Sequence, residues 1–262
     1  MLKLIEVLRM KYSIIVRDDE FSEKIARQIS QNIVHDKDLL NPDIVIAVGG
    51  DGTILRAVRT YFEKLDHIVF YGINTGHLGF YSNWNCNEVD DFINAINYKS
   101  NDVEKFNLLE FQLNNGKTKY ALNEITMRNN YCVEQFDVYI DGELFETFRG
   151  TGLCLSTTNG STALNKSLGG SIIDTDLEAI QLSEIASVNS NAYRTLGSSA
   201  VFSKNRKIEI KRDKPARVMI TADQEVFDVD FLNLEIKISD KQVCFAKNRM
   251  RTFWNRVNQS FI

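Results

Sequence analysis

Two different hydrophobic periods follow one another in the first hundred residues. Short apolar runs rich in β-branched residues are typical of buried strands, and apolar residues at spacings of three and four are typical of helices. Strands are therefore predicted at 12–16, 44–48 and 67–73, and helices at 19–34, 53–65 and 87–98. Because strands alternate with helices, this part predicts a Rossmann-like α/β domain with a parallel sheet.

The pattern changes near residue 105, where only short stretches with β character follow. Turn signals such as Asp141-Gly142 separate them. The predicted strands are 106–113, 119–128, 133–140, 143–148, 151–157, 206–212, 216–222, 233–238 and 241–246. The segment 174–186 is expected to be helical or irregular. The second half therefore predicts a mostly antiparallel β domain, which gives domains 1–104 and 105–246.

The turn Gly49-Gly50-Asp51-Gly52-Thr53 carries the strongest chemical signal. It joins a predicted buried strand to a predicted helix, and a helix N-terminus next to glycines attracts phosphate oxygens. A carboxylate placed there repels phosphate unless it binds a cation or takes a proton from an attacking hydroxyl. The turn therefore indicates phosphoryl transfer. The alternative is a tight turn in which Asp51 caps the helix.

Two further polar clusters lie in the second half. Asn123 and Glu124 end a strand pattern and could hold a diol such as a ribose, with a surface turn as the alternative. The stretch from Arg149 to Ala163 is rich in hydroxyl, amide and glycine residues, which suit a loop that presents polar groups to a ligand. The alternative there is a solvated Ser/Thr turn.

Composition excludes several classes of protein. The net charge of −4 gives no reason to expect a nucleic-acid partner, and no apolar stretch reaches membrane-spanning length. Four widely spaced cysteines indicate neither a zinc site nor a disulfide framework and fit a reduced cytoplasm. Hydrophobic and charged contents of 44% and 25% are ordinary for a globular chain. The start could be Met1 or Met10.

Taken in order, these motifs resemble those of the NAD kinase family, also called inorganic polyphosphate/ATP-NAD kinases. The Gly-Gly-Asp-Gly turn is shared with diacylglycerol, sphingosine and phosphofructo-kinases. More specific are residues 74–80 (Asn-Thr-Gly-His-Leu-Gly-Phe), the pair Asn123-Glu124 and the loop from Gly152 to Asn165. The similarity extends from about residue 12 to the end of the chain.

The resemblance implies that ATP or polyphosphate donates a phosphoryl group to the adenosine-ribose 2′-hydroxyl of NAD, giving NADP. It implies Asp51 as the catalytic proton acceptor, Mg²⁺ or another divalent cation brought with ATP, and no protein-bound metal. It also implies a homotetramer and a tail, 247–262, that packs back onto the first domain. The implied substrate-binding residues are Gly49, Gly50, Gly52, Thr53, Phe80, Asn123, Glu124, Thr151, Ser161, Thr162, Ala163, Leu164, Ser167 and Ala186.

Three residues depart from the family pattern. Thr151 stands where the family has Asp, Thr158 where it has Pro, and Leu164 where it has Tyr. In the family, the acid and the tyrosine line the dinucleotide site, so these changes bear on NAD affinity. Two alternatives therefore stay open: a catalytically weak NAD(P) sensor and a diacylglycerol-type lipid kinase. The sequence does not decide between ATP and polyphosphate, nor between NAD and NADH.

Overall fold

The computed structural model describes residues 9–76, 79–98, 102–113, 116–191, 194–247 and 252–262. The chain divides into two compact units. Unit 1 comprises Met1–Phe106 and Gln242–Ile262, and unit 2 comprises Asn107–Lys241. The chain passes from one unit to the other within β6 (Val103–Gln112) and β15 (Glu225–Ala246).

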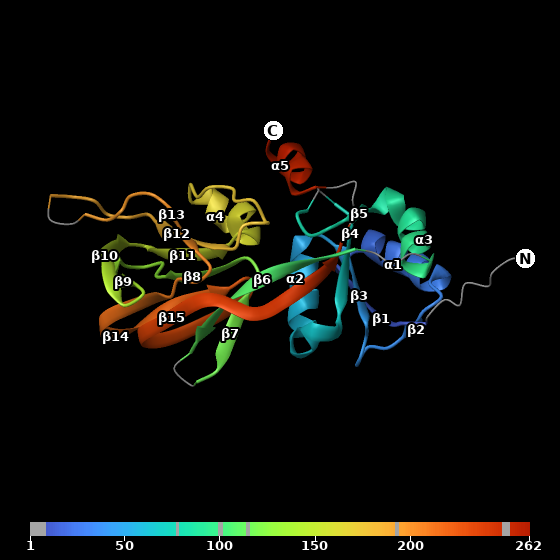
Figure 1. Ribbon diagram of the computed structural model, residues 1–262, viewed down its shortest axis with the longest axis horizontal. Coiled ribbons are helices and arrows are strands. Elements are labelled where there is room, and N and C mark those ends of the chain that lie inside the picture. Colours follow the sequence, from blue (N-terminus) through green and yellow to red (C-terminus); the bar gives the residue numbers. More distant parts are fainter. Residues whose placement is uncertain (1–8, 77–78, 99–101, 114–115, 192–193, 248–251) are drawn as a thin grey trace, which may run out of the picture. The chain divides into compact units, whose positions relative to one another are not determined.

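Unit 1 is built on a parallel sheet with helices on both faces (Figure 1). The strands run in the order β15-β4-β3-β1-β2, and β5 also pairs with β4. The strands are β1 (Lys11–Val16), β2 (Asp36–Lys37), β3 (Ile44–Gly49), β4 (Val69–Asn74) and β5 (Trp84–Asn85). The helices are α1 (Glu20–Asn32), α2 (Asp51–Thr60), α3 (Val89–Tyr98) and α5 (Phe253–Phe261), with short 3₁₀ turns at Phe62–His67 and Cys86–Glu88.

The faces of this sheet follow from the alternation of side chains along each strand. Tyr71 and Ile73 of β4 belong to the apolar cluster that α1 and α3 cover. Gly72 lies between them and faces α2, where a Cβ would come within 2.7 Å of Ile54. The buried β3 ends where α2 begins, so the α/β prediction is confirmed and the glycine turn lies at the carboxyl edge of the sheet.

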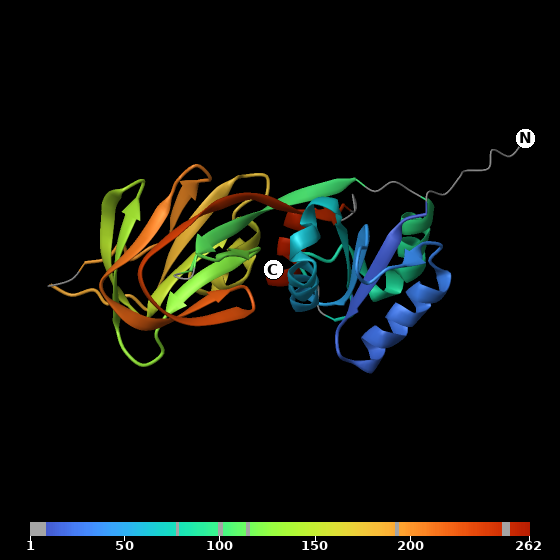
Figure 2. The same ribbon diagram turned by 90° about the horizontal axis from the view of Figure 1, so that it is seen from below.

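Unit 2 is mostly antiparallel β, as the sequence predicts, and its strands are strongly curved (Figure 2). They enclose an apolar core. Its remaining strands are β7 (Thr118–Ala121), β8 (Glu124–Arg128), β9 (Glu134–Ile140), β10 (Glu143–Gly150), β11 (Gly152–Thr157), β12 (Ala179–Ile185), β13 (Ala200–Ser203) and β14 (Ile208–Ala222). A 3₁₀ turn, η3 (Asn159–Thr162), and a short helix, α4 (Leu164–Ser167), follow β11.

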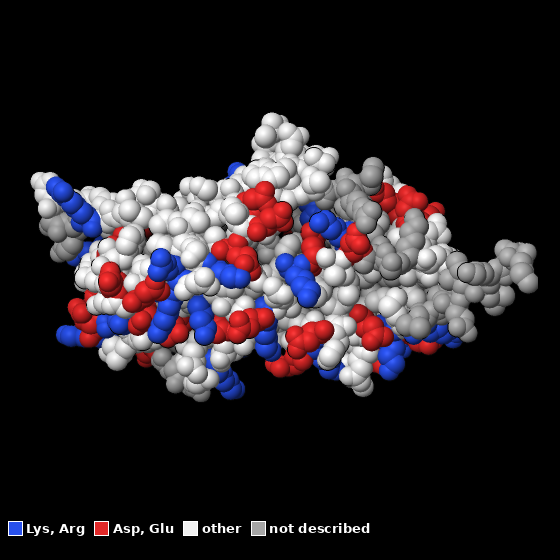
Figure 3. All heavy atoms as spheres, in the orientation of Figure 1, with Lys and Arg blue, Asp and Glu red and all other residues white. Residues whose placement is uncertain are grey.

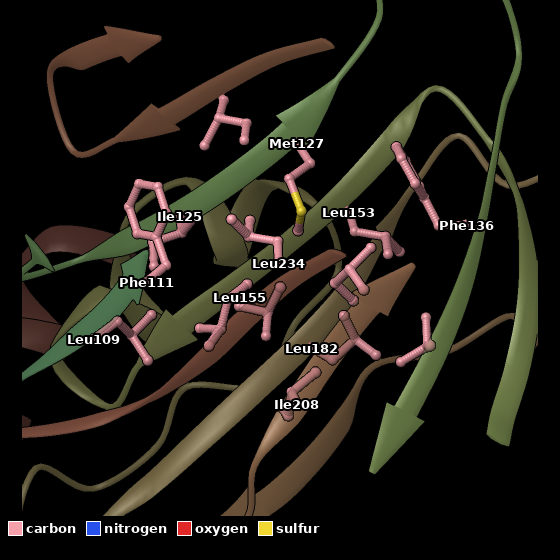
Figure 4. Close-up of a cluster of buried hydrophobic side chains, with 14 of the residues drawn as sticks. Leu109, Phe111, Ile125, Met127, Phe136, Leu153, Leu155, Leu182, Ile208 and Leu234 are labelled. Atoms are coloured by element: carbon pink, nitrogen blue, oxygen red, sulfur yellow. The ribbon is translucent and has the colours of Figure 1, made fainter. Parts of the chain in front are cut away.

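The core of unit 2 occupies one face of its central strands (Figure 4). Leu153 and Leu155 of β11 lie opposite Met127 and Ile125 of β8, and all four are buried.

Charged residues of both signs are interspersed on the surface (Figure 3), and exposed pairs such as Arg217–Asp228 at 2.6 Å contribute little to stability.

Three predictions of local structure are wrong. Residues 179–185 within the predicted helical or irregular segment form β12, whose Gln181 and Ser183 are buried because they hydrogen-bond internally. The paired stretches at 206–222 and at 233–246 are parts of the single strands β14 and β15. Conversely, the predicted strand 119–128 is two strands, because the N–H groups of Leu122 and Asn123 donate to the Asp223 side chain instead of to a neighbouring strand.

Candidate active site

Asp51 is the first residue of α2, directly after β3 and the N-cap Gly50. Its carboxylate does not cap its own helix. Instead, Oδ2 accepts a hydrogen bond from the Phe80 N–H at 2.8 Å, and Oδ1 accepts one from the Tyr81 N–H at 3.1 Å. The alternative that Asp51 is the helix cap is therefore wrong. The carboxylate is instead held by the loop that follows β4.

The protonation of Asp51 reflects opposing effects. Burial raises the pKa of its carboxyl group, whereas the two N–H donors and the Arg256 guanidinium lower it. Arg256 comes from α5 and donates hydrogen bonds to the Phe80 carbonyl and to the Asn83 side chain. A carboxylate with a raised pKa is a stronger base when ionised, which suits a proton acceptor.

The glycines of the turn bring the backbone close to the start of the helix. A Cβ on Gly49 would lie 2.2 Å from Thr53 Oγ1, so only glycine fits there. Gly50 supplies no side-chain cap, and Gly52 is the exposed residue of the first turn. The Thr53 and Ile54 N–H groups donate to the Gly50 carbonyl, so the N–H groups of Asp51 and Gly52 are the ones at the start of α2 that can donate to an anion.

Phe80 packs on the C-terminal helix. Its ring centroid lies 5.6 Å from that of Phe261 and 6.1 Å from that of Phe253. The loop that places Phe80 therefore also binds α5, through both its ring and its carbonyl. His77 and Leu78 of the same sequence motif lie outside the described residues.

Asn123 and Glu124 lie in unit 2, where β8 begins. Asn123 is only 8% exposed, so the surface-turn alternative is wrong. Burial and the neighbouring Asp223 raise the pKa of Glu124 to about 8, although a hydrogen bond from the Leu164 N–H lowers this pKa. Glu124 therefore holds its proton at neutral pH and can both donate and accept a hydrogen bond.

The Ser/Thr-rich stretch is buried rather than solvated. Ser156 and Thr157 end the central strand β11, and Ser161 and Thr162 form the buried turn η3. A Cβ on Gly160 would lie 2.0 Å from the Asn123 carbonyl oxygen, so this turn packs directly against the Asn123-Glu124 segment. The solvated-turn alternative is wrong.

The central strands of unit 2 have one apolar and one polar face. Glu124 lies opposite Ser156, and Thr126 lies opposite Cys154, on the face away from the leucine core. Buried polar atoms on or next to this face have no hydrogen-bond partner within the described residues: Glu124 Oε2, Ser156 Oγ, Asn159 Oδ1 and Asn165 Nδ2. An unpaired buried polar atom costs about 1–3 kcal/mol, so this region favours a polar ligand that supplies the partners.

Comparison with known proteins decides the family. The model of the ATP-NAD kinase N-terminal domain matches residues 12–100, and that of the ATP-NAD kinase C-terminal domain matches residues 122–247. An NAD kinase of Latilactobacillus sakei is 38% identical over 262 residues, covering 97% of this chain and 98% of its own. The chain belongs to the NAD kinase family. The resemblance drawn from the motifs is confirmed, and with it the assignment as a kinase.

Solved structures agree with this membership of the NAD kinase family. The crystal structure of an NAD kinase from Archaeoglobus fulgidus in complex with ATP matches with a TM-score of 0.78 and 25% identity, over 95% of this chain and 98% of that chain. A yeast NADH kinase complexed with NADH shares the fold, with a TM-score of 0.80 at 18% identity, over 97% of this chain and 87% of that chain.

The remaining residues implied by the NAD kinase family resemblance fall into two groups. Ala163, Leu164 and Ser167 lie in or next to α4. This helix lies near the end of β11 that pairs with Glu124 of β8. Thr151 and Ala186 lie at the other end, where the Thr151 N–H donates to the Ile185 carbonyl at 2.9 Å. Five residues of strand separate the two ends by about 16 Å, so unit 2 does not bring both groups together.

Two residues beside the candidate site escaped the sequence analysis. Asp223, in the turn between β14 and β15, accepts hydrogen bonds from the backbone around Asn123. Arg256 reaches the Phe80 loop from α5. The only signal for Asp223 is an acidic residue between two strand patterns, which is common to many turns. For Arg256 the signal is a basic residue in an aromatic tail.

We predict that Glu124→Gln removes a pH dependence of stability. The pKa of Glu124 is about 8 in the folded chain against an ordinary 4.5, so the folded state keeps a proton that the unfolded state releases between these values. Its contribution to stability is therefore present below pH 4.5 and is lost as pH rises to 8, by at most about 1.4 kcal/mol per pH unit. Melting temperatures from pH 5 to 9 measure this loss.

In Glu124→Gln the decline over this window is expected to be shallower than in the wild type. Glu143→Gln, which changes an exposed carboxylate on β10, is the control. If the melting temperature falls by the same amount from pH 5 to 9 in the wild type and in Glu124→Gln, the raised pKa of Glu124 is contradicted.

Proposed function

We propose that this chain transfers the γ-phosphoryl group of ATP to the adenosine-ribose 2′-hydroxyl of NAD, giving NADP and ADP. The observation that carries the proposal is the Asp51 carboxylate, which is half-buried at the start of α2 and held by the Phe80 and Tyr81 N–H groups. Phosphoryl transfer needs a positioned nucleophile and stabilised phosphate charge more than covalent chemistry by the protein. A fixed carboxylate next to the Asp51 and Gly52 N–H groups of the helix start supports both requirements.

In the proposed reaction, the ionised Asp51 carboxylate accepts the 2′-hydroxyl proton while the hydroxyl oxygen forms a bond to the γ-phosphorus. The bond from that phosphorus to its bridging oxygen breaks, and ADP leaves with the electron pair. The N–H groups at the start of α2 face phosphate oxygens, and Gly49, Gly50, Gly52 and Thr53 shape the turn that allows this approach.

We assign dinucleotide binding to unit 2. Asn123 and Glu124 hold the adenosine ribose, and η3 with α4 lines the pocket for the adenine and ribose through Ser161, Thr162, Ala163, Leu164 and Ser167. The hydroxyls of Ser161 and Thr162 bond within the loop, to Ile173 and Asn159. These two residues therefore shape the pocket, while the unpartnered Glu124 and Ser156 atoms remain for the ligand. We also assign Phe80 to dinucleotide binding, with its ring as an apolar contact for the ligand.

A divalent cation such as Mg²⁺ enters with ATP in this scheme. Within the described part of the chain, no group of three or more His, Cys, Asp or Glu side chains could hold a metal ion. Magnesium in kinase sites is commonly bound by substrate phosphates with one or two carboxylates, so ATP itself provides most of its ligands. The cation supplies neutralisation of phosphate charge.

The quaternary state and location are part of the proposal. Thr151 and Ala186 lie away from Glu124 within unit 2, so they contribute to a dinucleotide site only if a second copy supplies them. A homotetramer provides such copies. Tyr193 and Arg194 are candidate interface anchors of such a tetramer, and Tyr193 lies outside the described residues. All four cysteines are free, which supports a reducing cytoplasm. Among the described helices, none has the length and apolar composition needed to cross a membrane.

A turnover assay tests the proposed function. The purified chain is incubated with NAD, ATP and Mg²⁺, and NADP is measured with a dehydrogenase that accepts only the 2′-phosphorylated cofactor. Polyphosphate replaces ATP in a parallel reaction, and NADH replaces NAD in another. We expect NADP with ATP. Binding of NAD without any turnover supports the NAD(P)-sensor alternative, and phosphorylation of diacylglycerol instead of NAD supports the lipid-kinase alternative.

We predict that Leu164→Tyr tightens NAD binding. Leu164 begins α4 beside Glu124 and is 37% exposed, so a ring there needs no space in the core. Stacking on a planar ring of the ligand adds about 0.5–1.5 kcal/mol, a two- to tenfold gain in affinity. Calorimetric titration with NAD measures the gain, and Leu177→Tyr, at an exposed leucine outside the site, is the control. Weaker binding with a lowered melting temperature indicates that the pocket has repacked.

A further inference from the structure

The segment from Leu122 to Glu124 has an unusually complete set of hydrogen bonds to two residues. The Leu122 N–H donates to Asp223 Oδ2 at 2.8 Å, and the Asn123 and Glu124 N–H groups donate to Asp223 Oδ1 at 2.7 and 3.3 Å. The Asp223 N–H in turn donates to the Glu124 carbonyl at 3.0 Å. One aspartate therefore binds the backbone of three consecutive residues.

Thr157 holds the same segment from the other side. Its hydroxyl donates to the Leu122 carbonyl at 2.7 Å, and its N–H donates to the Asn123 carbonyl at 2.9 Å. Every backbone N–H and carbonyl group from Leu122 to Glu124 thus has a partner on Asp223 or Thr157. The segment has little freedom to shift relative to β11 or the β14–β15 turn.

The backbone of Asp223 shows that this position is special. Its φ is +50°, in the left-handed region where glycine is usual in a two-residue hairpin turn. A glycine would relieve the strain but would supply no acceptor. The carboxylate is buried, which raises its pKa to about 6, while the three N–H donors counteract this rise.

We propose that Asp223 is a positioning residue that fixes Asn123 and Glu124 for binding the ribose of the dinucleotide substrate. The inference rests on the proposed function, since it takes the ribose as the ligand of this pair. Asp223 acts through the backbone of the segment rather than by touching the substrate. Glu124 Oε2, which is buried without a partner, is the atom that this arrangement presents.

Two variants and one matched control test the proposal. Asp223→Gly suits the positive φ but removes all three acceptors, and Asp223→Asn keeps the shape but replaces one acceptor oxygen with a donor. Asp141→Asn is the control, because Asp141 has a φ of +52° in the β9–β10 turn and its carboxylate accepts the Lys207 N–H at 2.9 Å. Asp141 lies outside the proposed site.

We expect Asp223→Gly to raise KM for NAD by about 10- to 100-fold, since displacing binding groups by about 1 Å has an effect of this order. Asp223→Asn is expected to give a smaller increase of the same kind. In both, kcat at saturating NAD should change less than about threefold, because the proton acceptor Asp51 is untouched. KM for ATP should stay at its wild-type value in both variants. The control Asp141→Asn should keep the wild-type KM and kcat.

The pH profile supplies a readout that a merely structural role would not move. Glu124 faces Asp223, the Cys154 thiol of β11 and the Leu164 N–H of α4. Burial keeps the Cys154 thiol neutral by raising its pKa, so Asp223 is the negative charge that acts on Glu124. Removing this charge lowers the pKa of Glu124 from about 8. The pH at which KM for NAD changes should therefore move to lower values in Asp223→Asn.

Amide hydrogen exchange without any ligand tests the hydrogen bonds themselves. Exchange at residues 122–124 should accelerate in Asp223→Gly and remain slow in the control. If the wild type forms NADP while both variants keep its KM for NAD and its pH profile, the positioning role is wrong and the proposed function stands. If the wild type forms no NADP, the proposed function itself fails. If Asp223→Gly does not fold, KM and the pH profile of Asp223→Asn decide.

Discussion

Asp51→Asn is expected to lower the turnover of NADP formation by about 10²–10⁴-fold, because the proton acceptor for the 2′-hydroxyl is lost. Asparagine still offers one oxygen to the Phe80 or Tyr81 N–H but cannot accept a proton. NAD binding should remain nearly unchanged, since the ribose-binding groups that we propose lie in unit 2. Steady-state kinetics and calorimetry with NAD measure the two effects separately.

The pH dependence of turnover shows in which protonation state Asp51 acts. The carboxyl group must be ionised to accept a proton, and burial raises its pKa above the ordinary value of 3.8. The wild type should therefore lose turnover as pH falls through this raised pKa, and the residual activity of Asp51→Asn should lack that decline. Asp90→Asn, an exposed acid in the first turn of α3, is the control. A folded Asp51→Asn variant with more than a tenth of wild-type turnover contradicts the assignment.

Gly79→Ala is expected to have the second largest effect, although the substitution adds only a methyl group. A Cβ on Gly79 would lie 2.3 Å from Asp51 Oδ1 and 2.9 Å from Cγ. The carboxylate must move away and lose its present geometry with the Phe80 and Tyr81 N–H groups. A misplacement of this size lowers turnover by about 10²-fold.

The control for Gly79→Ala comes from the same loop. A Cβ on Gly76 would meet only the end of the Arg17 side chain at 3.2 Å, so Gly76→Ala should keep near wild-type turnover. Melting temperatures show whether crowding also destabilises Gly79→Ala, for which overpacking predicts about 1–3 kcal/mol. Equal turnover in Gly79→Ala and the wild type would mean that the position of Asp51 seen here is not the catalytic one.

The parts of the fold that the sequence predicts are those with a simple hydrophobic period. The apolar run before Gly49 and the spacing of apolar residues in α1 are sufficient for the parallel sheet and its helices. β12 was missed because the buried Gln181 and Ser183 interrupt its apolar pattern. Long-range hydrogen bonds, rather than hydrophobicity, make these positions interior, and no local pattern reveals them.

The candidate site shows the same division. The glycine turn identified Asp51 because a carboxylate is unusual among phosphate-attracting groups. The residues that hold the site were not identified, because their roles depend on contacts across 100 residues for Asp223 with Asn123 and 176 residues for Arg256 with Phe80. The family resemblance implies both Thr151 and Glu124 as substrate-binding residues, and the register of β11 against β8 sets them at opposite ends of the strand within one chain.

The most direct test of the account is a crystal structure of this chain with bound NAD. We predict the adenosine-ribose 2′-oxygen within hydrogen-bond distance, about 2.6–3.2 Å, of an Asp51 carboxylate oxygen, with the ribose hydroxyls also bonded to Asn123 and Glu124. An ordered NAD whose 2′-hydroxyl points away from Asp51, or whose ribose is held without Asn123 and Glu124, contradicts the account.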